Sequence, residues 1–239
     1  MNEAAKSEWR YIGRRKGRAL NQTRQEALDK LYPQLAITEN LLCRKGTLDP
    51  KQLFSSQPQK IIFEIGFGNG ERLARHIDRA DAHTAFIGAE PFLNGLSAFL
   101  CEETINANSP VRLWHDDAMI IADSLKPHSV NQIYILNPDP WHKTRHFKRR
   151  IINPDNLDRL ARILKPDGDL IVSSDVPPLI DWMVTHTVNH KAFAWTAYTP
   201  EDWQKPPPDW LSTHYEGKRA KGAAQMAYLF FKRRAEASI

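Results

Sequence analysis

The sequence predicts an α/β fold, a single Rossmann-like domain built on a mostly parallel, doubly wound sheet. From Ile61 onward, strand-like apolar runs alternate with segments whose apolar residues recur at helical spacing. This alternation is typical of a parallel sheet covered by helices on both faces. The second observation is the stretch 61–71 (IIFEIGFGNGE), which reads as a buried strand, a glycine turn and the start of a helix. Such a sheet opens its ligand crevice at a turn of this kind.

The expected elements follow one another in chain order. A short helix over 22–32 should end at Pro33, since proline cannot continue a helix. After the glycine turn, Leu73, Ala74 and Ile77 fall at helical spacing. Further strands are expected at 83–90, 111–115, 131–136 and 169–174, helices at 92–108 and 153–164, a turn at 165–168 (KPDG) and a last apolar run at 223–232.

Composition limits the class of protein. With 239 residues, 41% hydrophobic and 26% charged, the chain is long enough for a full core and ordinary for a soluble protein. It has neither an apolar run long enough to cross a membrane nor the apolar core of a signal peptide, so we expect a cytoplasmic location. The two cysteines are far apart, which argues against a metal site or a disulfide framework.

The net charge of +5 favours a polyanionic partner. Basic residues gather in the first 20 positions around Trp9 and Tyr11. This stretch is either a solvated tail or an arm that contacts phosphates and offers aromatic rings for stacking. We therefore expect a basic N-terminal arm and short helix over 1–58, followed by the main domain over 59–239.

The glycine turn indicates the ligand. Gly66, Gly68 and Gly70 are spaced G-x-G-x-G, whereas a dinucleotide site has G-x-G-x-x-G. Glu64 precedes the first glycine, and its carboxylate would repel a pyrophosphate. An acid here suits S-adenosylmethionine, which has a cationic amino-acid end and no phosphate. A purely structural turn or a nucleotide site is the alternative.

Acids stand at or near the ends of the five expected strands: Glu64, Glu90, Asp117, Asp139 and Asp175. Ligands bind at this edge of an open α/β sheet. Any single acid could instead cap the helix that follows it. We expect Glu64 near the methionine end of S-adenosylmethionine, Glu90 at the ribose hydroxyls, and Asp117 at the adenine amino group, with Asp116 as a rival. Asp139 should lie where the methyl acceptor enters.

A basic loop follows the fourth strand. Residues 137–150 read NPDPWHKTRHFKRR, in which Pro138 and Pro140 stiffen the backbone around Asp139. Five cationic side chains then fall within the eight residues 143–150, with Trp141, His142 and Phe147 close by. Clustered Lys and Arg with aromatic rings at a site mouth suit an RNA backbone and its bases. A merely solvated loop is the alternative.

At this point the sequence resembles a known family, the bacterial tRNA (guanine-N7-)-methyltransferases that modify guanine 46 of the variable loop. The similar segments occur in family order and cover most of the chain from Ile61: FEIGFGNG (63–70), GAEP (88–91), DDA (116–118), the loop 137–150, SSD (173–175) and THYEGK (213–218). PDPW-x-K followed by RH-x-KRR is the most specific of them. The resemblance implies a class I S-adenosylmethionine-dependent methyltransferase fold and tRNA as substrate.

The resemblance also implies roles for single residues. Glu64, Glu90, Asp117 and Asp139 match acids that contact S-adenosylmethionine, together with the glycine turn, and Asp139 also matches the residue assigned to catalysis. The substrate-binding positions are Lys143, Arg145, His146, Asp175, Thr213, His214, Tyr215 and Glu216. The sequence departs from the family at Asn137, Thr144 and His214, on the substrate side, and at Pro91 beside Glu90.

Other functions stay open on the sequence alone. A methyltransferase acting on another RNA base is the nearest rival, since the basic loop argues against a small-molecule acceptor. A non-catalytic RNA-binding module of the same fold would not need acids at the cofactor edge. A dinucleotide-dependent oxidoreductase is disfavoured by Glu64 and by the glycine spacing.

Overall fold

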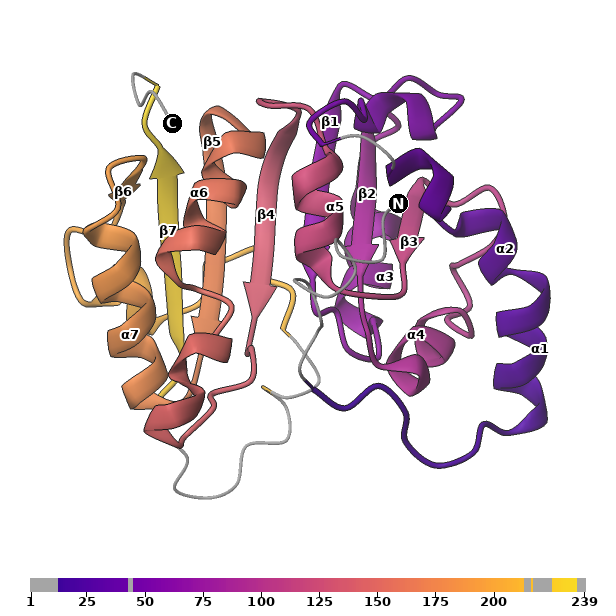
Figure 1. The fold of residues 1–239 in the computed structure, drawn as a ribbon, viewed down its shortest axis with the longest axis horizontal. Helices are drawn as coiled ribbons and strands as arrows, with labels where there is room; N and C mark the ends of the chain where they lie inside the picture. Colours follow the sequence, from indigo (N-terminus) through magenta and orange to yellow (C-terminus); the bar gives the residue numbers. More distant parts are fainter. Residues whose placement is uncertain (1–12, 43–44, 213–215, 217–224, 236–239) are drawn as a thin grey trace.

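A computed structural model describes residues 13–42, 45–212, 216 and 225–235. Within these residues, the strands form one sheet in the order β3-β2-β1-β4-β5-β7-β6 (Figure 1). The first five strands are mutually parallel, and β7 runs antiparallel between β5 and β6. The predicted Rossmann-like, mostly parallel sheet is therefore confirmed. The strands are β1 (Lys60–Ile65), β2 (Thr84–Ala89), β3 (Val111–Trp114), β4 (Val130–Leu136), β5 (Leu164–Ser174), β6 (Phe193–Trp195) and β7 (Ala227–Arg233).

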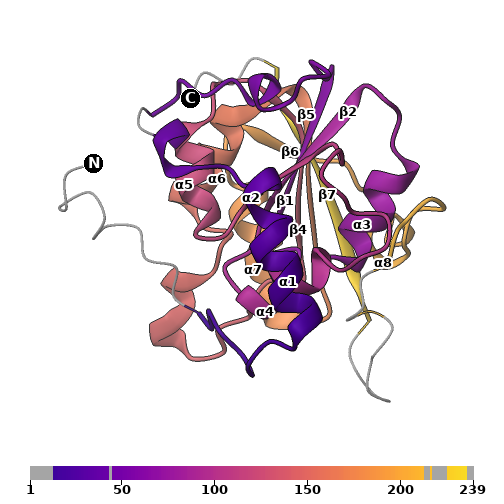
Figure 2. The same ribbon diagram turned by 90° about the vertical axis from the view of Figure 1, so that its right-hand side faces the viewer.

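Helices cover both faces of the sheet (Figure 2). Helices α3 and α4 pack with the apolar side chains of one face, whereas α5, α6 and α7 pack with those of the other. The helices are α1 (Gln22–Lys30), α2 (Tyr32–Leu35), α3 (Glu71–Arg79), α4 (Leu93–Phe99), α5 (Ala118–Ser124), α6 (Pro154–Ile163), α7 (Pro177–Val188) and α8 (Glu201–Gln204), with short 3-10 helices η1 (Glu39–Leu42), η2 (Pro50–Leu53) and η3 (Thr144–Arg149).

Three expected elements differ from the structure. The helix expected to end at Pro33 ends earlier, at Lys30, and Pro33 lies in the first turn of α2, where a proline is tolerated. The helix expected over 92–108 is too long, since α4 ends at Phe99. Beyond it, the backbone N–H of Asn106 donates to Ser109 Oγ and that of Asn108 to Asn106 Oδ1, and such bonds compete with helix formation. The turn expected at 165–168 lies inside β5, where the register with β4 shifts and Asp167 has φ of 58°.

The segment before β1 packs onto the sheet. Leu35 and Ile37 are buried in the two apolar clusters, one on each face. Ala36 and Leu48 form isolated parallel bridges with Leu113 and Leu125. The described part of 1–58 thus shares the core of the main domain, and the boundary at residue 58 stays a prediction.

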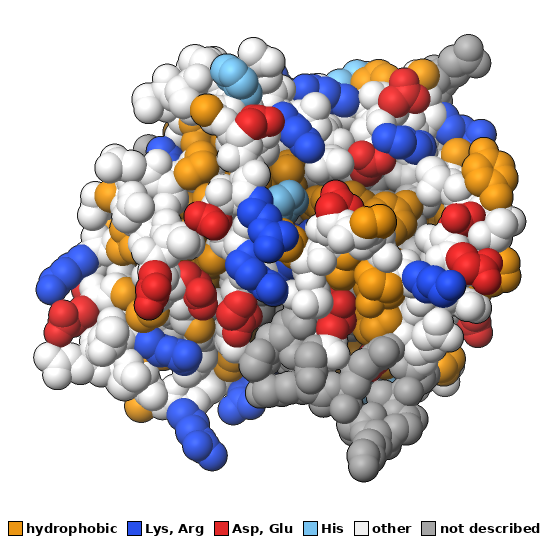
Figure 3. Space-filling model, turned by 180° about the vertical axis from the view of Figure 1, so that it is seen from behind, with side chains coloured by type: hydrophobic (Ala, Val, Ile, Leu, Met, Phe, Trp, Pro, Cys, Tyr) orange, Lys and Arg blue, Asp and Glu red, His pale blue; other side chains and the backbone are white. Residues whose placement is uncertain are grey.

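Charge is mixed on the face that α3 and α8 cover. Lys and Arg side chains there stand beside Asp and Glu rather than forming a patch of one sign (Figure 3). None of the described helices has the length and apolar character that a membrane crossing requires. Among the described residues, His, Cys, Asp and Glu form no cluster of three that could hold a metal ion.

Candidate active site

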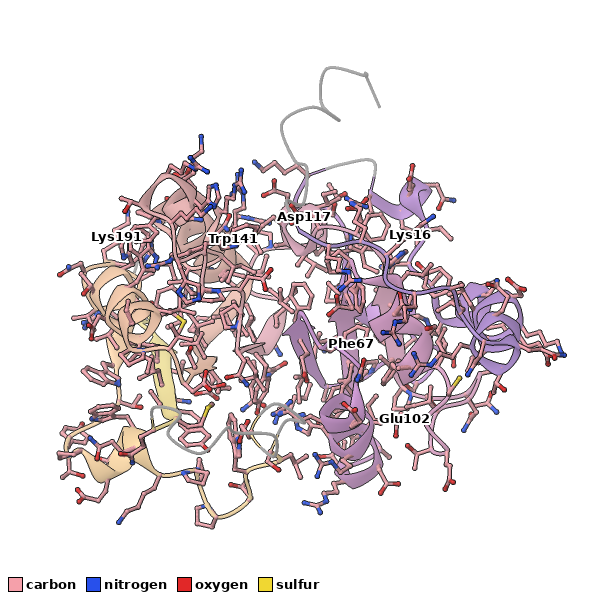
Figure 4. All side chains as sticks on the ribbon, turned by 90° about the horizontal axis from the view of Figure 1, so that it is seen from below. Lys16, Phe67, Glu102, Asp117, Trp141 and Lys191 are labelled. Atoms are coloured by element: carbon pink, nitrogen blue, oxygen red, sulfur yellow. The ribbon has the colours of Figure 1, made fainter. Side chains whose placement is uncertain are left out.

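A cavity of about 1080 Å³ opens at the carboxyl ends of the parallel strands. Its walls come from the ends of β1, β2 and β4, the glycine turn, the first turns of α5 and α6, the basic loop and α7. Figure 4 looks onto this edge and shows Asp117 and Trp141 on one side of the strands, opposite Glu102. The topology thus places the cavity where ligands of open α/β sheets bind.

The glycine turn forms the floor between β1 and α3. Gly66, Gly68 and Gly70 have φ values of 72°, 61° and 83°, a left-handed conformation that favours glycine. A Cβ at Gly66 or Gly68 would meet no atom within 4 Å, and both residues line the cavity. A Cβ at Gly70 would instead overlap Phe99. The first two glycines therefore expose backbone toward the space where a ligand would lie.

Glu90 follows β2 and joins two walls of the cavity. Its Oε2 accepts a hydrogen bond from the Gly68 N–H at 2.7 Å, and its Oε1 accepts one from the Phe92 N–H at 2.8 Å. Glu90 is 6% exposed. Burial raises the pKa of this carboxyl to about 7, although the two backbone donors lower it, and the negative charge of Asp139 raises it further.

We expect affinity for S-adenosylmethionine to increase with pH because of Glu90. A carboxylate accepts hydrogen bonds from ribose hydroxyls and attracts a cation better than the neutral acid does. With a pKa of about 7, Glu90 is mostly neutral at pH 6 and mostly ionised at pH 8, so the dissociation constant should fall roughly tenfold over that range. Isothermal titration at both pH values measures it.

The control is Glu90→Gln, which removes the ionisation and keeps the shape of the side chain. Asp117 and Asp139 line the same cavity, so any pH dependence left in this variant belongs to them or to the ligand. If the dissociation constant for S-adenosylmethionine changed with pH equally in the variant and in the unchanged protein, Glu90 would not be the group responsible for the pH dependence.

Asp117 and Asp116 have different surroundings. Asp117 lines the cavity, and its Oδ1 accepts from the Met119 N–H at 2.9 Å, which caps α5. Burial raises the pKa of Asp117. Asp116 is ion-paired with Arg15, which comes from the N-terminal segment. The structure therefore places Asp117, and not its rival, in the cavity wall.

Asp139 lies in the wall between two residues with unusual backbone. Asn137 and Trp141 have φ values of 48° and 46°, and for a bulky residue such as tryptophan a positive φ is strained. The prolines on both sides of Asp139 further limit the backbone. Asp139 is exposed as a residue, but partial desolvation of its carboxyl group raises the pKa of that group. Its carboxyl group is thus held on a stiff stretch of chain and partly removed from water.

The basic loop folds back over this stretch. Arg149 lies with its guanidinium 5.0 Å from the Trp141 ring centre, and His146 packs edge-on against the same ring. Lys148 and Arg149 line the cavity, whereas Lys143 and Arg145 are exposed outside it. Burial, together with the neighbouring cations, lowers the pKa of His146. Part of the predicted substrate loop thus forms the rim of the cavity.

The remaining predicted residues lie elsewhere. Asp175 is half-buried directly after β5 and does not line the cavity. Thr213, His214 and Tyr215 lie outside the described residues. Glu216 accepts hydrogen bonds from Trp210 Nε1 at 3.1 Å and from the Tyr228 hydroxyl at 3.3 Å.

Glu64 has surroundings that the sequence does not indicate. It is 3% exposed, and Arg72 Nη1 on α3 donates to its Oε2 at 2.7 Å. Its neighbours in β1, Ile65 and Phe63, pack on the opposite face. Glu64 does not line the cavity, so its contact with the methionine end of S-adenosylmethionine stays a prediction.

Sequence reasoning missed the residues that α7 brings to the cavity. Trp182 and His186 line it and stack on each other with ring centres 3.9 Å apart. The available signal is modest: two prolines that begin a helix, and two rings one turn apart. Arg14, from the N-terminal segment, also lines the cavity.

Comparison with known proteins gives the family. A family model described as "Putative methyltransferase" matches residues 58–228. A tRNA (guanine-N(7)-)-methyltransferase of Rhodospirillum rubrum is 38% identical, with 100% of this chain and 93% of the relative covered. One of Rhizobium meliloti is 41% identical over 93% of this chain and 94% of its own.

The chain belongs to the tRNA (guanine-N7-)-methyltransferase family. It is a methyltransferase that depends on S-adenosylmethionine, as the sequence predicts. Among solved structures, the 16S rRNA methyltransferase KamB is similar in fold, with a TM-score of 0.52, 13% identity, and 80% of this chain and 95% of that chain covered. The aminoglycoside resistance methyltransferase NpmB1 has a TM-score of 0.50 and 14% identity, with 90% of this chain and 95% of that chain covered. These similarities support the Rossmann-like methyltransferase fold alone.

The cavity of this methyltransferase fits its cofactor. The open space over Gly66 and Gly68 would be filled by any side chain there. Glu90 and Asp117 supply carboxylates in the adjoining wall, which suit the hydroxyl and amino donors of an adenosine. The volume of about 1080 Å³ lies at the upper end of the range for ligand sites, which is large enough for S-adenosylmethionine.

Proposed function

We propose that the chain transfers a methyl group from S-adenosylmethionine to N7 of guanine 46 in the variable loop of tRNA. The observation that supports this most is that Asp139 lines the same cavity as the acids Glu90 and Asp117 and as Lys148 and Arg149 of the basic loop, whose cations suit an RNA backbone. The names of the relatives support tRNA and guanine N7 as substrate. The choice of position 46 rests on the family resemblance.

The chemistry needs no general base. Guanine N7 carries a free lone pair and no proton. When bound, S-adenosylmethionine supplies an electrophilic methyl group on its sulfonium. A bond from N7 to the methyl carbon would form in line with the carbon–sulfur bond, and the electrons of the breaking carbon–sulfur bond would go to sulfur. The residues of the chain therefore act by positioning, and alignment of reactants is worth roughly 7–11 kcal/mol.

Asp139 is proposed to hold the guanine. Its carboxylate can accept from the N1–H and the amino group of guanine, which leaves N7 directed away from it. Because Asp139 is partly desolvated, hydrogen bonds to its carboxylate are stronger than in water. Asp175, at the end of the neighbouring strand β5, is proposed as a second acceptor.

The basic rim is proposed to bind tRNA phosphates, which predicts a steep dependence on salt. On a duplex, each phosphate contact contributes about 0.9 to the slope of log affinity against log salt concentration. Lys148→Ala should therefore reduce this slope by about 0.9. The matched control is Lys191→Ala, an exposed lysine just after α7 that does not line the cavity (Figure 4), which should leave the slope unchanged. Equal slopes for all three proteins would contradict a phosphate contact at Lys148.

Position 46 is tested with two tRNA transcripts, one unmodified and one with adenine in place of guanine 46. Labelled methyl should reach the first and not the second. Transfer to both would show a methyltransferase with another target base. Binding of S-adenosylmethionine without transfer to either would argue for a different acceptor.

A further inference from the structure

Arg150 stands apart from the other cationic residues of the basic loop. Its side chain is buried, with 3% of the residue exposed, whereas Lys143, Arg145 and Lys148 are exposed. A phosphate of a bound tRNA cannot reach a guanidinium at this depth without rearrangement. Burial of a cation costs free energy, so the contacts that hold Arg150 indicate what it does.

The contacts of Arg150 are with backbone and aromatic rings. Its Nε donates to the carbonyl oxygen of Pro140 at 2.9 Å, and its Nη1 lies 3.5 Å from that of Pro178 at the start of α7. The guanidinium lies over the rings of Phe147 and Trp182, with 3.8 and 4.9 Å to the ring centres. In the part of the chain that the structure describes, no carboxylate pairs with it.

These contacts act on the backbone that holds Asp139. Pro140 directly follows Asp139, and Trp141 after it has the strained φ of 46°. A strained backbone persists only where its surroundings hold it in several ways. The carbonyl oxygen of Arg150 in turn accepts from Asn153 Nδ2 at 2.9 Å, just before α6. Arg150 thus links the Asp139 stretch to the starts of α6 and α7.

We propose that Arg150 is a positioning residue for methyl transfer, which holds the carboxylate of Asp139 at the cavity wall and does not contact tRNA. This inference rests on the proposed role of Asp139. A positional error of about 1 Å in such a group can cost on the order of 10²-fold in rate. Arg150 therefore matters for turnover rather than for affinity.

The test uses Arg150→Lys, which keeps the charge and loses the planar guanidinium. Lysine cannot both stack on two rings and direct a fixed N–H at the Pro140 carbonyl. Turnover of the full chain on unmodified tRNA should fall on the order of 10²-fold. The dissociation constants for S-adenosylmethionine and tRNA should stay within about twofold of those of the unchanged protein.

The matched control is Arg233→Lys. Arg233 is 2% exposed, and its Nε donates to the carbonyl oxygen of Ala161 at 2.8 Å, the same kind of bond outside the cavity lining. This variant should lose stability without losing turnover of the folded fraction. The second test is the double variant of Arg150→Lys with Asp139→Asn. If Arg150 acts through Asp139, the double variant should be no slower than Asp139→Asn alone within about twofold.

Three outcomes would overturn the inference. Turnover of Arg150→Lys within twofold of the unchanged protein would show that Asp139 needs no such support. A loss of tRNA affinity in place of turnover would make Arg150 a substrate contact. If the losses of turnover in the two single variants multiplied in the double variant, Arg150 would act independently of Asp139. If the unchanged protein methylates tRNA but Asp139→Asn does too, the proposed role of Asp139 fails instead.

Discussion

Asp139→Asn should lower the turnover number for tRNA methylation by about 10²–10³-fold, the range seen when one preorganised polar group is removed from a transition state. The amide keeps the shape of the carboxylate, but it replaces one acceptor oxygen by a donor that would face the guanine N–H groups. Since the phosphates are proposed to bind the basic rim rather than Asp139, the tRNA dissociation constant should change little. Single-turnover kinetics with labelled S-adenosylmethionine measure the chemical step directly.

The control for this variant is Asp202→Asn. Asp202 is exposed and accepts hydrogen bonds only from its own loop among the described contacts, through the Tyr198 and Thr199 N–H groups and the Thr199 hydroxyl. It should turn over at the rate of the unchanged protein. Unchanged turnover in Asp139→Asn would remove Asp139 from the mechanism. A parallel loss of S-adenosylmethionine affinity would indicate a role in cofactor binding as well.

Arg72→Met should destabilise the fold by about 3–5 kcal/mol, the cost of leaving a buried charge without its partner. Arg72 and Glu64 have side chains that are only 5% and 4% exposed. The Arg72 guanidinium also lies 4.3 Å from the Tyr134 ring centre and 5.5 Å from that of Trp210. Urea unfolding of the variant and the unchanged protein gives the difference in free energy.

The double variant Glu64→Gln with Arg72→Met separates charge from packing. Because it removes the uncompensated carboxylate, it should regain part of the lost stability. If Arg72→Met lowered the free energy of unfolding by less than about 1 kcal/mol, Glu64 would not need Arg72 as a partner in order to be buried. If Glu64→Gln by itself weakened S-adenosylmethionine binding more than it weakened folding, the predicted cofactor contact of Glu64 would be supported.

The sheet could be predicted from sequence because its signals are local. Apolar runs, a glycine turn and acids at strand ends repeat along the chain, and each of these features depends on neighbouring residues. The short strand β6 and helix α7 were missed, since a three-residue strand has almost no pattern of its own and α7 has a weak one. The helix expected over 92–108 was too long because apolar spacing alone does not mark the end at Phe99, and the later residues of that range form a turn with side-chain bonds at Asn106 and Ser109.

The cavity was harder to predict because its details depend on distant residues. Asp116 and Asp117 are adjacent in sequence, and what separates them is their tertiary surroundings: Asp116 pairs with Arg15, about a hundred residues away, whereas Asp117 lines the cavity. Glu64 looks like a ligand contact until Arg72 is placed beside it. Arg150 reads as one more cation in a basic run, and its burial depends on Trp182 from α7.

The most direct test of the proposed reaction uses tRNA with 7-deazaguanine at position 46, in which a C–H group replaces N7. The edge that Asp139 is proposed to bind, N1–H and the amino group, is unchanged in this base. We predict that the modified tRNA binds with the affinity of the natural one, inhibits competitively and accepts no methyl group. Methyl transfer to the 7-deazaguanine tRNA at a rate near that of the natural tRNA would contradict N7 of guanine 46 as the acceptor.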